Sequence, residues 1–123
     1  MVYRCLLVDD SVDFLTSASA FLSSEGLDVV GTATNGKHAL VQAEALRPDV
    51  ALVDVQLGKE DGRDVARALA ALLVPPRVVL ISSHARDELH ELIEGSDAVD
   101  YLPKSELRAA TIIELIASAS RDR

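Results

Sequence analysis

Short apolar runs alternate along the chain with longer segments in which apolar residues recur at helical spacing. The runs are rich in Val, Leu and Ile, and they span Tyr3–Val8, Leu27–Thr32, Val50–Val53, Val78–Ile81 and Ala98–Leu102. The run at 78–81 is apolar at every position, which is typical of a strand buried on both faces of a parallel sheet. The pattern therefore predicts five buried strands.

The segments between these runs predict five helices. In the first helix one face carries Phe14, Leu15, Ala18, Phe21 and Leu22, the spacing of an amphipathic helix. The other helices are expected over about Gly36–Leu46, Gly62–Leu73, Arg86–Glu94 and Ser105–Ser118. In the third we expect Leu72 and Leu73 to point inward, and in the last we expect Ser105 to cap the N-terminus.

Glycine and proline mark the expected boundaries. Gly26 and Gly95 stand where the first and fourth helices should stop, because glycine readily ends a helix. Pro48 and Pro75–Pro76 come just before the third and fourth strands, where they end the preceding helices. Strand and helix alternating five times predict an α/β fold, a doubly wound parallel sheet covered by helices on both faces.

Composition limits the size and the partners of this fold. With 123 residues the chain has the length of one domain, so we expect a single domain over residues 1–123. The 12 Lys and Arg against 20 Asp and Glu give a net charge of −8, which disfavours binding to nucleic acid or to an anionic membrane by this domain.

The sequence also predicts a soluble, cytoplasmic protein. Its one cysteine, Cys5, cannot form an internal disulfide and is expected to fill space in the core. Met1 to Val8 does not read as a signal peptide. The longest apolar candidate for a membrane span, Ala70–Ile81, is interrupted by two prolines and an arginine.

Polar residues follow the predicted strands at the points where function is expected. Asp9 and Asp10 come after the first strand, Asp54 ends the third, Ser82 follows the fourth and Lys104 follows the fifth. In a doubly wound sheet, ligands bind outside the carboxyl ends of the strands. Three acids, a hydroxyl and a lysine should therefore meet at one edge.

This set of side chains favours a divalent cation and a phosphoryl group. Three neighbouring carboxylates repel one another unless a cation compensates their charge, and hard oxygen donors without His or Cys suit Mg²⁺ or Mn²⁺. Lys104 can pair with a carboxylate or a phosphoryl oxygen, and Ser82 can donate a hydrogen bond to such an oxygen. An aspartate in these surroundings can accept a phosphoryl group covalently.

The same residues resemble a known family. Val8-Asp9-Asp10-Ser11, Asp54, Asp61-Gly62, Ser82 and Tyr101-Leu102-Pro103-Lys104 together resemble the bacterial response-regulator receiver domain, over roughly Tyr3 to Ser118. The resemblance implies a flavodoxin-like three-layer sandwich, with a five-stranded parallel sheet in the order 2-1-3-4-5 and five helices.

The resemblance also implies roles for individual residues. Asp54 would be the phosphoacceptor, with Asp10 and Asp9 as metal ligands, Asp9 either directly or through water. The remaining implied roles are metal ligation by the main-chain carbonyl of Gln56, phosphoryl binding and switching by Ser82, Lys104 and Tyr101, and tuning of the phosphoryl lifetime by Gln56 and His84.

Two departures from the family pattern affect this transfer. Gly58 stands where a proline is usual, which should make the loop after Asp54 looser. Ser105 follows Lys104 in place of the customary proline, so the usual cis-proline cannot form, and the Lys104–Ser105 bond is expected to be trans or, rarely, a strained cis bond.

The function implied is a phosphorylation switch in a two-component phosphorelay. The expected partners are a sensor histidine kinase or phosphotransfer protein, then a protein target or an effector domain in cis, with phosphorylation-dependent homodimerisation as a further expectation. The chain would not be an enzyme beyond transfer to and loss from its own aspartate. As given it carries no output domain, so the alternative is the receiver portion of a longer DNA-binding transcriptional regulator.

Two other classes of protein share parts of this layout. An aspartate-nucleophile phosphatase needs a second aspartate two residues after the nucleophile, and here Gln56 follows Asp54, while Ser11 follows Asp9. A flavodoxin-like cofactor carrier needs a Ser/Thr/Gly loop after the first strand to cradle phosphate. The acidic pair Asp9-Asp10 would repel that phosphate.

Overall fold

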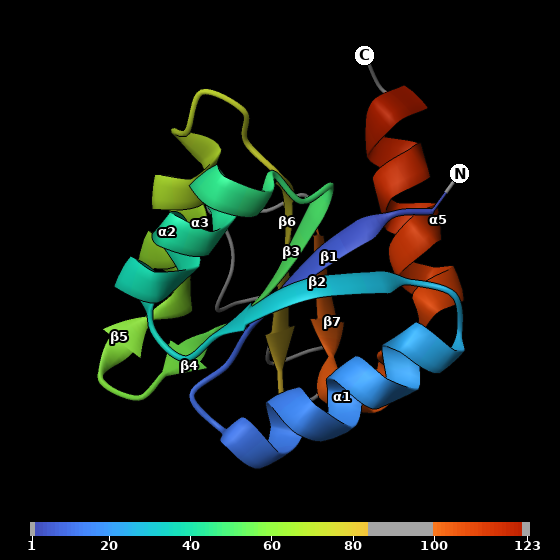
Figure 1. Ribbon diagram of the computed structural model, residues 1–123, viewed down its shortest axis with the longest axis horizontal. Helices are drawn as coiled ribbons and strands as arrows, with labels where there is room; N and C mark the ends of the chain where they lie inside the picture. Colours follow the sequence, from blue (N-terminus) through green and yellow to red (C-terminus); the bar gives the residue numbers. More distant parts are fainter. Residues whose placement is uncertain (1, 84–99, 122–123) are drawn as a thin grey trace.

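The computed structural model describes residues 2–83 and 100–121. Strands and helices alternate along the described chain (Figure 1). In chain order the elements are β1 (Arg4–Val8), α1 (Val12–Ser24), β2 (Asp28–Ala33), α2 (Gly36–Leu46), β3 (Val50–Asp54), β4 (Gln56–Leu57), β5 (Glu60–Asp61), α3 (Gly62–Ala70), β6 (Arg77–Ser82), β7 (Asp100–Pro103), the 3₁₀ turn η1 (Lys104–Glu106) and α5 (Ala109–Arg121).

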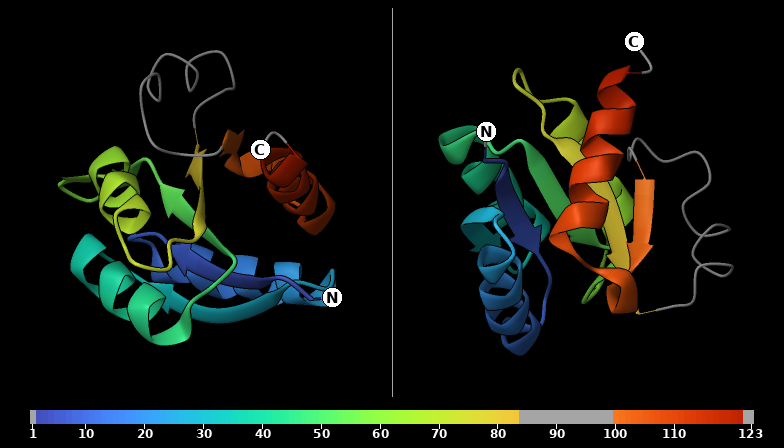
Figure 2. Two further views of the ribbon diagram at one scale, coloured as in Figure 1. Left: turned by 90° about the horizontal axis from the view of Figure 1, so that it is seen from above. Right: turned by 90° about the vertical axis from the view of Figure 1, so that its right-hand side faces the viewer.

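Five strands form the main sheet, in the order β2-β1-β3-β6-β7. All four pairings are parallel, and the order is the predicted 2-1-3-4-5. Helices α1 and α5 lie on one side of this sheet and α2 and α3 on the other (Figure 2). The doubly wound α/β fold expected from the alternating pattern is thus confirmed.

The strands contribute side chains to two cores, one on each face, because successive residues of a strand point to opposite sides. Leu7 and Leu52 face α1 and α5, whereas Leu6 and Val53 face α2 and α3. Strand β3 is buried at every position, which explains why its sequence is apolar without alternation. Cys5 is a buried free thiol in the core between the sheet and helices α1 and α5, as predicted.

A short antiparallel hairpin of β4 and β5 follows β3. The hairpin was not predicted, since strands of two residues leave no periodicity to detect. Gly58 lies at its turn with φ of 60°, a conformation that two-residue hairpin turns require and that glycine adopts without strain. Gly58 therefore closes a defined turn here rather than simply loosening the loop.

Two inward-facing predictions are wrong. Helix α3 ends at Ala70 rather than Leu73, because the amides of Ala71 and Leu72 bond to carbonyls three residues back, at Ala68 and Leu69, which tightens and closes the last turn. The chain then turns toward Pro75–Pro76, which leaves Leu73 fully exposed. In α1 the buried stripe is Leu15, Ala18 and Leu22, so Phe21, at the edge of this stripe, is 45% exposed.

The last helix also begins later than predicted. Ser105 lies inside η1, which has no side-chain cap, and α5 starts at Ala109. The amide of Ala109 donates to Glu25 Oε1 over 2.9 Å, so a carboxylate at the end of α1 satisfies the first turn of α5. The predicted buried face of this helix is observed at Ile112 and Ile116.

Several predictions lie outside the described residues: the helix expected over 86–94, Gly95, the first residues of the strand expected from Ala98, and His84. Gly26 is described, and it ends α1 with φ of 104°, as predicted. Among the described helices, none has the length and apolar character that crossing a membrane requires.

Candidate functional site

Asp9 and Asp10 follow the last residue of β1, where the chain leaves the sheet. The amide of Asp9 still pairs with Ala33 of β2 over 3.0 Å, which keeps this residue in line with the sheet. Its Oδ1 accepts a 2.9 Å hydrogen bond from the amide of Ser11, and its side chain is buried. Asp10, by contrast, is exposed. The pair thus offers one fixed carboxylate and one that solvent reaches.

Asp54 is the last residue of β3, in the centre of the sheet. Its Oδ1 accepts a 3.1 Å hydrogen bond from the amide of Gln56, and its Oδ2 lies 3.4 Å from Lys104 Nζ. The side chain is 11% exposed. One carboxylate oxygen therefore points toward a cation while the other is held by the main chain of its own loop.

Lys104 directly follows β7 and bridges two of the carboxylates. Its Nζ lies 2.6 Å from Asp9 Oδ2 and 3.4 Å from Asp54 Oδ2. The Lys104–Ser105 bond is trans, one of the two conformations expected for it. The ammonium group of Lys104 thus reaches the ends of both β1 and β3 without the proline that usually follows this lysine.

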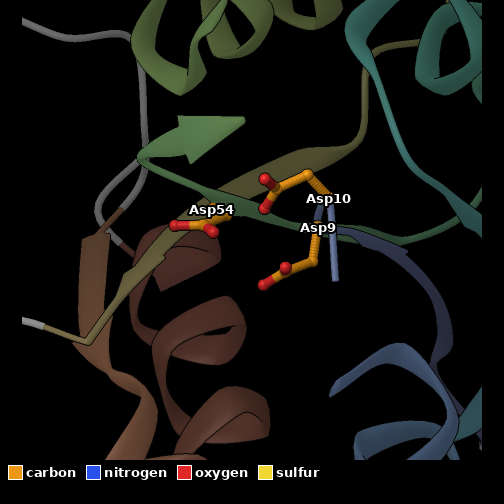
Figure 3. Close-up of side chains that lie close together, drawn as sticks. All are labelled: Asp9, Asp10 and Asp54. Atoms are coloured by element: carbon orange, nitrogen blue, oxygen red, sulfur yellow. The ribbon is translucent and has the colours of Figure 1, made fainter. Parts of the chain in front are cut away.

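Asp9, Asp10 and Asp54 lie side by side at the ends of β1 and β3 (Figure 3). One carboxylate oxygen from each lies within 4.8 Å of the others. Oxygens on opposite sides of an octahedral Mg²⁺ are about 4.1 Å apart, so a small movement or one bridging water would bring the set to coordination distance. Three carboxylates against one ammonium retain excess negative charge, and the donor set fits a hard divalent cation.

Burial raises the pKa of Asp54, and the nearby charge of Asp9 acts in the same direction. The Gln56 amide and Lys104 oppose this rise without cancelling it. For Lys104, burial lowers the pKa, but the hydrogen bonds and charges of Asp9 and Asp54 outweigh burial and leave the pKa raised. Additional positive charge next to Asp54 would therefore stabilise its ionised form.

Ser82 and Tyr101 lie on neighbouring strands of the sheet. Ser82 is the last residue of β6, is 2% exposed, and is paired with Pro103, the residue before Lys104. Tyr101 pairs with Leu80, so Ser82, two residues further along β6, is on the same face of the sheet. Tyr101 is half-buried and packs against the core beneath α2 and α3. The two predicted switch residues therefore share a face near the site.

The β4–β5 hairpin brings Gln56 and Gly58 to the edge of the site. The amide of Gln56 binds Asp54, while its side chain is exposed. A Cβ placed at Gly58 would lie 3.8 Å from Asp10 Oδ2, so the turn of the hairpin runs beside the exposed carboxylate. The metal-binding role of the Gln56 carbonyl remains a prediction, and His84 lies outside the described residues.

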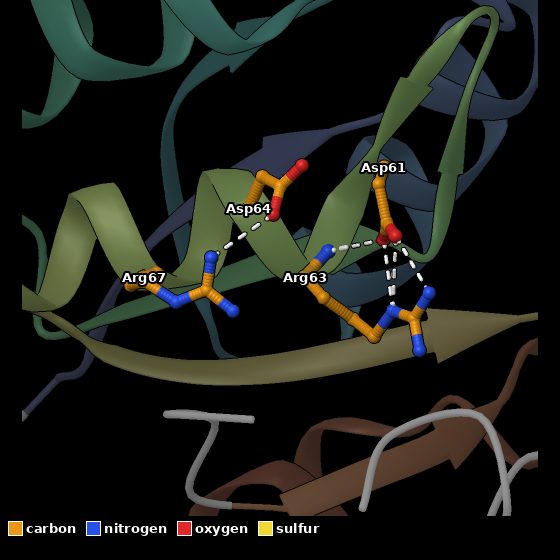
Figure 4. Close-up of polar contacts among 4 residues, drawn as sticks. All are labelled: Asp61, Arg63, Asp64 and Arg67. Carbon is orange, nitrogen blue, oxygen red and sulfur yellow. Dashed lines mark hydrogen bonds and ion pairs between the residues drawn. The ribbon is translucent and has the colours of Figure 1, made fainter. Parts of the chain in front are cut away.

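Asp61 and Gly62 connect the hairpin to α3. Asp61 caps the helix by accepting from the amide of Arg63, and it forms an ion pair with the Arg63 guanidinium at 2.6 Å (Figure 4). Gly62 packs so closely that a Cβ there would overlap the carbonyl oxygen of Asp54, and its amide donates to Val55 over 2.7 Å. This glycine allows α3 to begin directly against the main chain of Asp54.

Two residues of α1 and its C-cap have contacts that sequence reasoning did not foresee. The ring of Phe14 in α1 lies beneath the ammonium of Lys104, with Nζ 4.2 Å from its centroid. Glu25, at the other end of α1, binds Arg108 and the first amide of α5. Phe14 was expected on the inward face of its helix, but no sequence signal paired it with a lysine so far along the chain.

Comparison with known proteins gives a consistent match. A family model described as the response regulator receiver domain matches residues 5–117. A protein-glutamate methylesterase/protein-glutamine glutaminase of Pseudomonas aeruginosa is 40% identical over 108 residues, covering 85% of this chain and 29% of that protein. The chain thus spans less than a third of this curated relative.

Solved structures show the same fold. A CheY-like response regulator receiver domain protein from Methanospirillum hungatei superposes with a TM-score of 0.80 at 21% identity, with both chains covered in full. The response regulator domain of Thermotoga maritima CheB gives a TM-score of 0.76 at 26% identity, with 97% of this chain and 96% of that one covered. The first of these bears on the fold alone.

Proposed function

The chain belongs to the response regulator receiver domain family, and from this we propose that residues 1–123 act as a phosphorylation switch with Asp54 as the phosphoacceptor. The observation that carries the proposal is the position of Asp54, whose carboxylate lies beside those of Asp9 and Asp10 and 3.4 Å from the ammonium of Lys104. The donor would be a phosphohistidine on a sensor kinase or phosphotransfer protein.

In the proposed reaction a carboxylate oxygen of Asp54 attacks phosphorus. The new O–P bond forms as the P–N bond to the donor imidazole breaks, and the imidazole leaves with the electron pair and is reprotonated. Asp9 and Asp10 would hold Mg²⁺ or Mn²⁺, with the Gln56 carbonyl as a further ligand. When bound, the metal supplies positive charge against the phosphoryl oxygens.

The neighbours of Asp54 suit a switch. Lys104 already lies 3.4 Å from its Oδ2 and would pair with the phosphoryl oxygens, which carry more charge than the carboxylate does. Ser82 would donate its hydroxyl to the same oxygens, and Tyr101, on the same face of the sheet, would change rotamer in response. This change would alter the surface formed by β7 and the adjoining helices.

The test is phosphorylation by a small donor. Incubated with Mg²⁺ and acetyl phosphate, the wild-type chain should gain one phosphoryl mass increment, and Asp54→Asn should gain none. Asp64→Asn is the matched control, because Asp64 is an exposed aspartate whose described contact is an ion pair with Arg67 (Figure 4), and it should be modified like the wild type. Equal modification of Asp54→Asn would show that the acceptor is another residue.

Output is proposed to pass through protein contacts, in the cytoplasm, with no catalysis beyond transfer to and loss from Asp54. The net charge of −8 argues against direct binding of nucleic acid by this domain. The similarity to part of a methylesterase favours a methylesterase-type effector over a DNA-binding effector. That effector would lie either in the same chain or in a separate protein. Sedimentation with and without acetyl phosphate, with Asp54→Asn as the control, tests whether phosphorylation instead produces a homodimer.

A further inference from the structure

The aromatic ring of Phe14 contacts Lys104, the same lysine that pairs with Asp9 and Asp54. Lys104 Nζ lies 4.2 Å from the centroid of the Phe14 ring, within the roughly 6 Å over which a cation and an aromatic face attract. The same nitrogen is 2.6 Å from Asp9 Oδ2 and 3.4 Å from Asp54 Oδ2. The ammonium is therefore enclosed by two carboxylates and one aromatic face.

The ring is held where it can support the lysine. The amide of Phe14 donates to the hydroxyl of Ser11, the N-cap of α1, over 3.2 Å. Ser11 in turn donates its amide to Asp9 Oδ1. One turn of chain therefore fixes both the carboxylate that binds Lys104 and the ring beneath it.

Lys104 needs such support more than an arginine would. An ammonium group is a point charge with three equivalent donors on a flexible four-carbon chain, so an ion pair does not by itself fix its direction. Asp9 lies closer to Nζ than Asp54 does, which draws the lysine toward the end of β1. A negative ring face below the nitrogen restricts its path to the space between the two aspartates.

We propose that Phe14 is a positioning residue that holds the ammonium of Lys104 over Asp54 through a cation–π contact. The proposal rests on the proposed function, in which Lys104 binds the phosphoryl group on Asp54. It differs from a purely structural role for Phe14, since filling the edge of the core under α1 requires only an apolar side chain and not an aromatic one.

NMR tests the contact without any phosphorylation. The chain has three lysines, and Lys37 and Lys59 are exposed, so they serve as internal references. The ε-methylene protons of Lys104 should be shifted upfield by the ring current of Phe14. That shift should vanish in Phe14→Leu and persist in Phe21→Leu, which makes the same change in the other phenylalanine of the same helix.

Kinetics tests the positioning role. Phe14→Leu should slow phosphorylation by acetyl phosphate about three- to tenfold, the factor expected for one cation–π contact. Phe14→Tyr should restore the wild-type rate, and Phe21→Leu should keep it. In a Lys104→Ala background, Phe14→Leu should cause no further loss, because a ring that acts through the lysine has nothing left to position.

Fluorination separates the charge of the ring face from its volume. Phe21→Leu leaves Phe14 as the sole phenylalanine, so growth on fluorinated phenylalanine alters that ring alone. Each added fluorine weakens the negative face, and the rate should fall stepwise with fluorine number while the free energy of unfolding stays nearly constant.

Different failures have different meanings. The positioning role is overturned if Phe14→Leu slows the Lys104→Ala chain as much as the wild type, or if leucine matches phenylalanine in rate and leaves the Lys104 shift unchanged. If the wild-type chain accepts no phosphoryl group while the Lys104 shift is present and depends on Phe14, the proposed function fails and the cation–π contact stands.

Discussion

Replacing Gly62 by alanine should damage the site through the main chain, with no functional side chain removed. Gly62 is buried at the start of α3, and its amide donates to the carbonyl of Val55 over 2.7 Å. An alanine Cβ would overlap the carbonyl oxygen of Asp54 and lie 2.8 Å from both the carbonyl carbon of Asp54 and Val55 Cα. All three are main-chain atoms, so no side-chain rotation relieves the overlap.

The magnitude follows from these contacts. Forcing extra volume into a packed interior costs about 1–3 kcal/mol, and weakening the Gly62–Val55 hydrogen bond adds about 1 kcal/mol. We therefore expect Gly62→Ala to lower the free energy of unfolding by roughly 2–4 kcal/mol. Because the atoms that must move belong to Asp54 and Val55, the Asp54 carboxylate should also shift relative to Lys104, and the proposed phosphorylation should slow.

Gly26→Ala is the matched control, because alanine is unfavourable at the two positions for different reasons: contact with neighbouring atoms at Gly62 and backbone conformation at Gly26. Gly26 has φ of 104° and no atom within 4 Å of an added Cβ, so alanine there is strained by its own backbone, at about 1–2 kcal/mol, and touches nothing. Urea unfolding should show both variants destabilised. Phosphorylation by acetyl phosphate, measured where both are fully folded, should be slow only for Gly62→Ala.

Two results would refute this reasoning. If Gly62→Ala unfolds within about 0.5 kcal/mol of the wild type, the close approach of α3 to β3 is not a constraint on the fold. If it is destabilised yet is phosphorylated as fast as Gly26→Ala, the main chain relaxes without moving the Asp54 carboxylate. In that case the glycine matters for stability alone.

Three further predictions concern single carboxylates. Mg²⁺ at a hundred times its Kd should raise the free energy of unfolding of the wild type by about 2.7 kcal/mol. The variant Asp10→Ala, changed at an exposed position, should lose most of that gain. Urea unfolding of both proteins with and without the metal measures it. The amide of Ala109 and the Arg108 guanidinium hold the pKa of Glu25 below its usual range. The wild type should therefore be more stable than Glu25→Gln at neutral pH, and this difference should be lost as pH falls from the ordinary glutamate pKa of about 4.3 through the lowered value. Unfolding of both proteins across that pH range measures the difference. Glu60→Ala removes the acceptor of the Gly36 amide and should cost about 0.5–1.5 kcal/mol, with faster hydrogen exchange at that amide as the direct readout.

Most of the fold could be predicted from the sequence, because a parallel strand that is covered on both faces must be apolar at nearly every position. Runs such as Val50–Val53 are apolar throughout, since both faces of β3 are covered. The strand order was not contained in that pattern and came from the resemblance to a family. Helix ends were the weakest part, and Leu73 shows why: a leucine at helical spacing faces inward only while the helix continues, and α3 stops at Ala70.

Candidate site residues at strand ends were predictable for a topological reason. Parallel strands bring their carboxyl ends to one edge, so Asp9, Asp54 and Lys104 had to converge once each had been placed after its strand. The β4–β5 hairpin could not be found in this way, because Gln56–Leu57 and Glu60–Asp61 are too short to show a period. Its turn at Gly58 depends on a single backbone angle.

The contacts of Phe14 and Glu25 could not be predicted in this way, because no rule of topology specifies them. Phe14 contacts Lys104 in η1, and Glu25 contacts Ala109 in α5, only because α1 packs at a particular depth and rotation beside this part of the chain. A shift of one turn along α1 would keep an apolar face toward the sheet while removing both contacts. These two contacts therefore fix the position of α1 more narrowly than its apolar stripe does. Replacing Phe14 should therefore change the geometry around Lys104, and replacing Glu25 should change the start of α5, while the overall fold is retained.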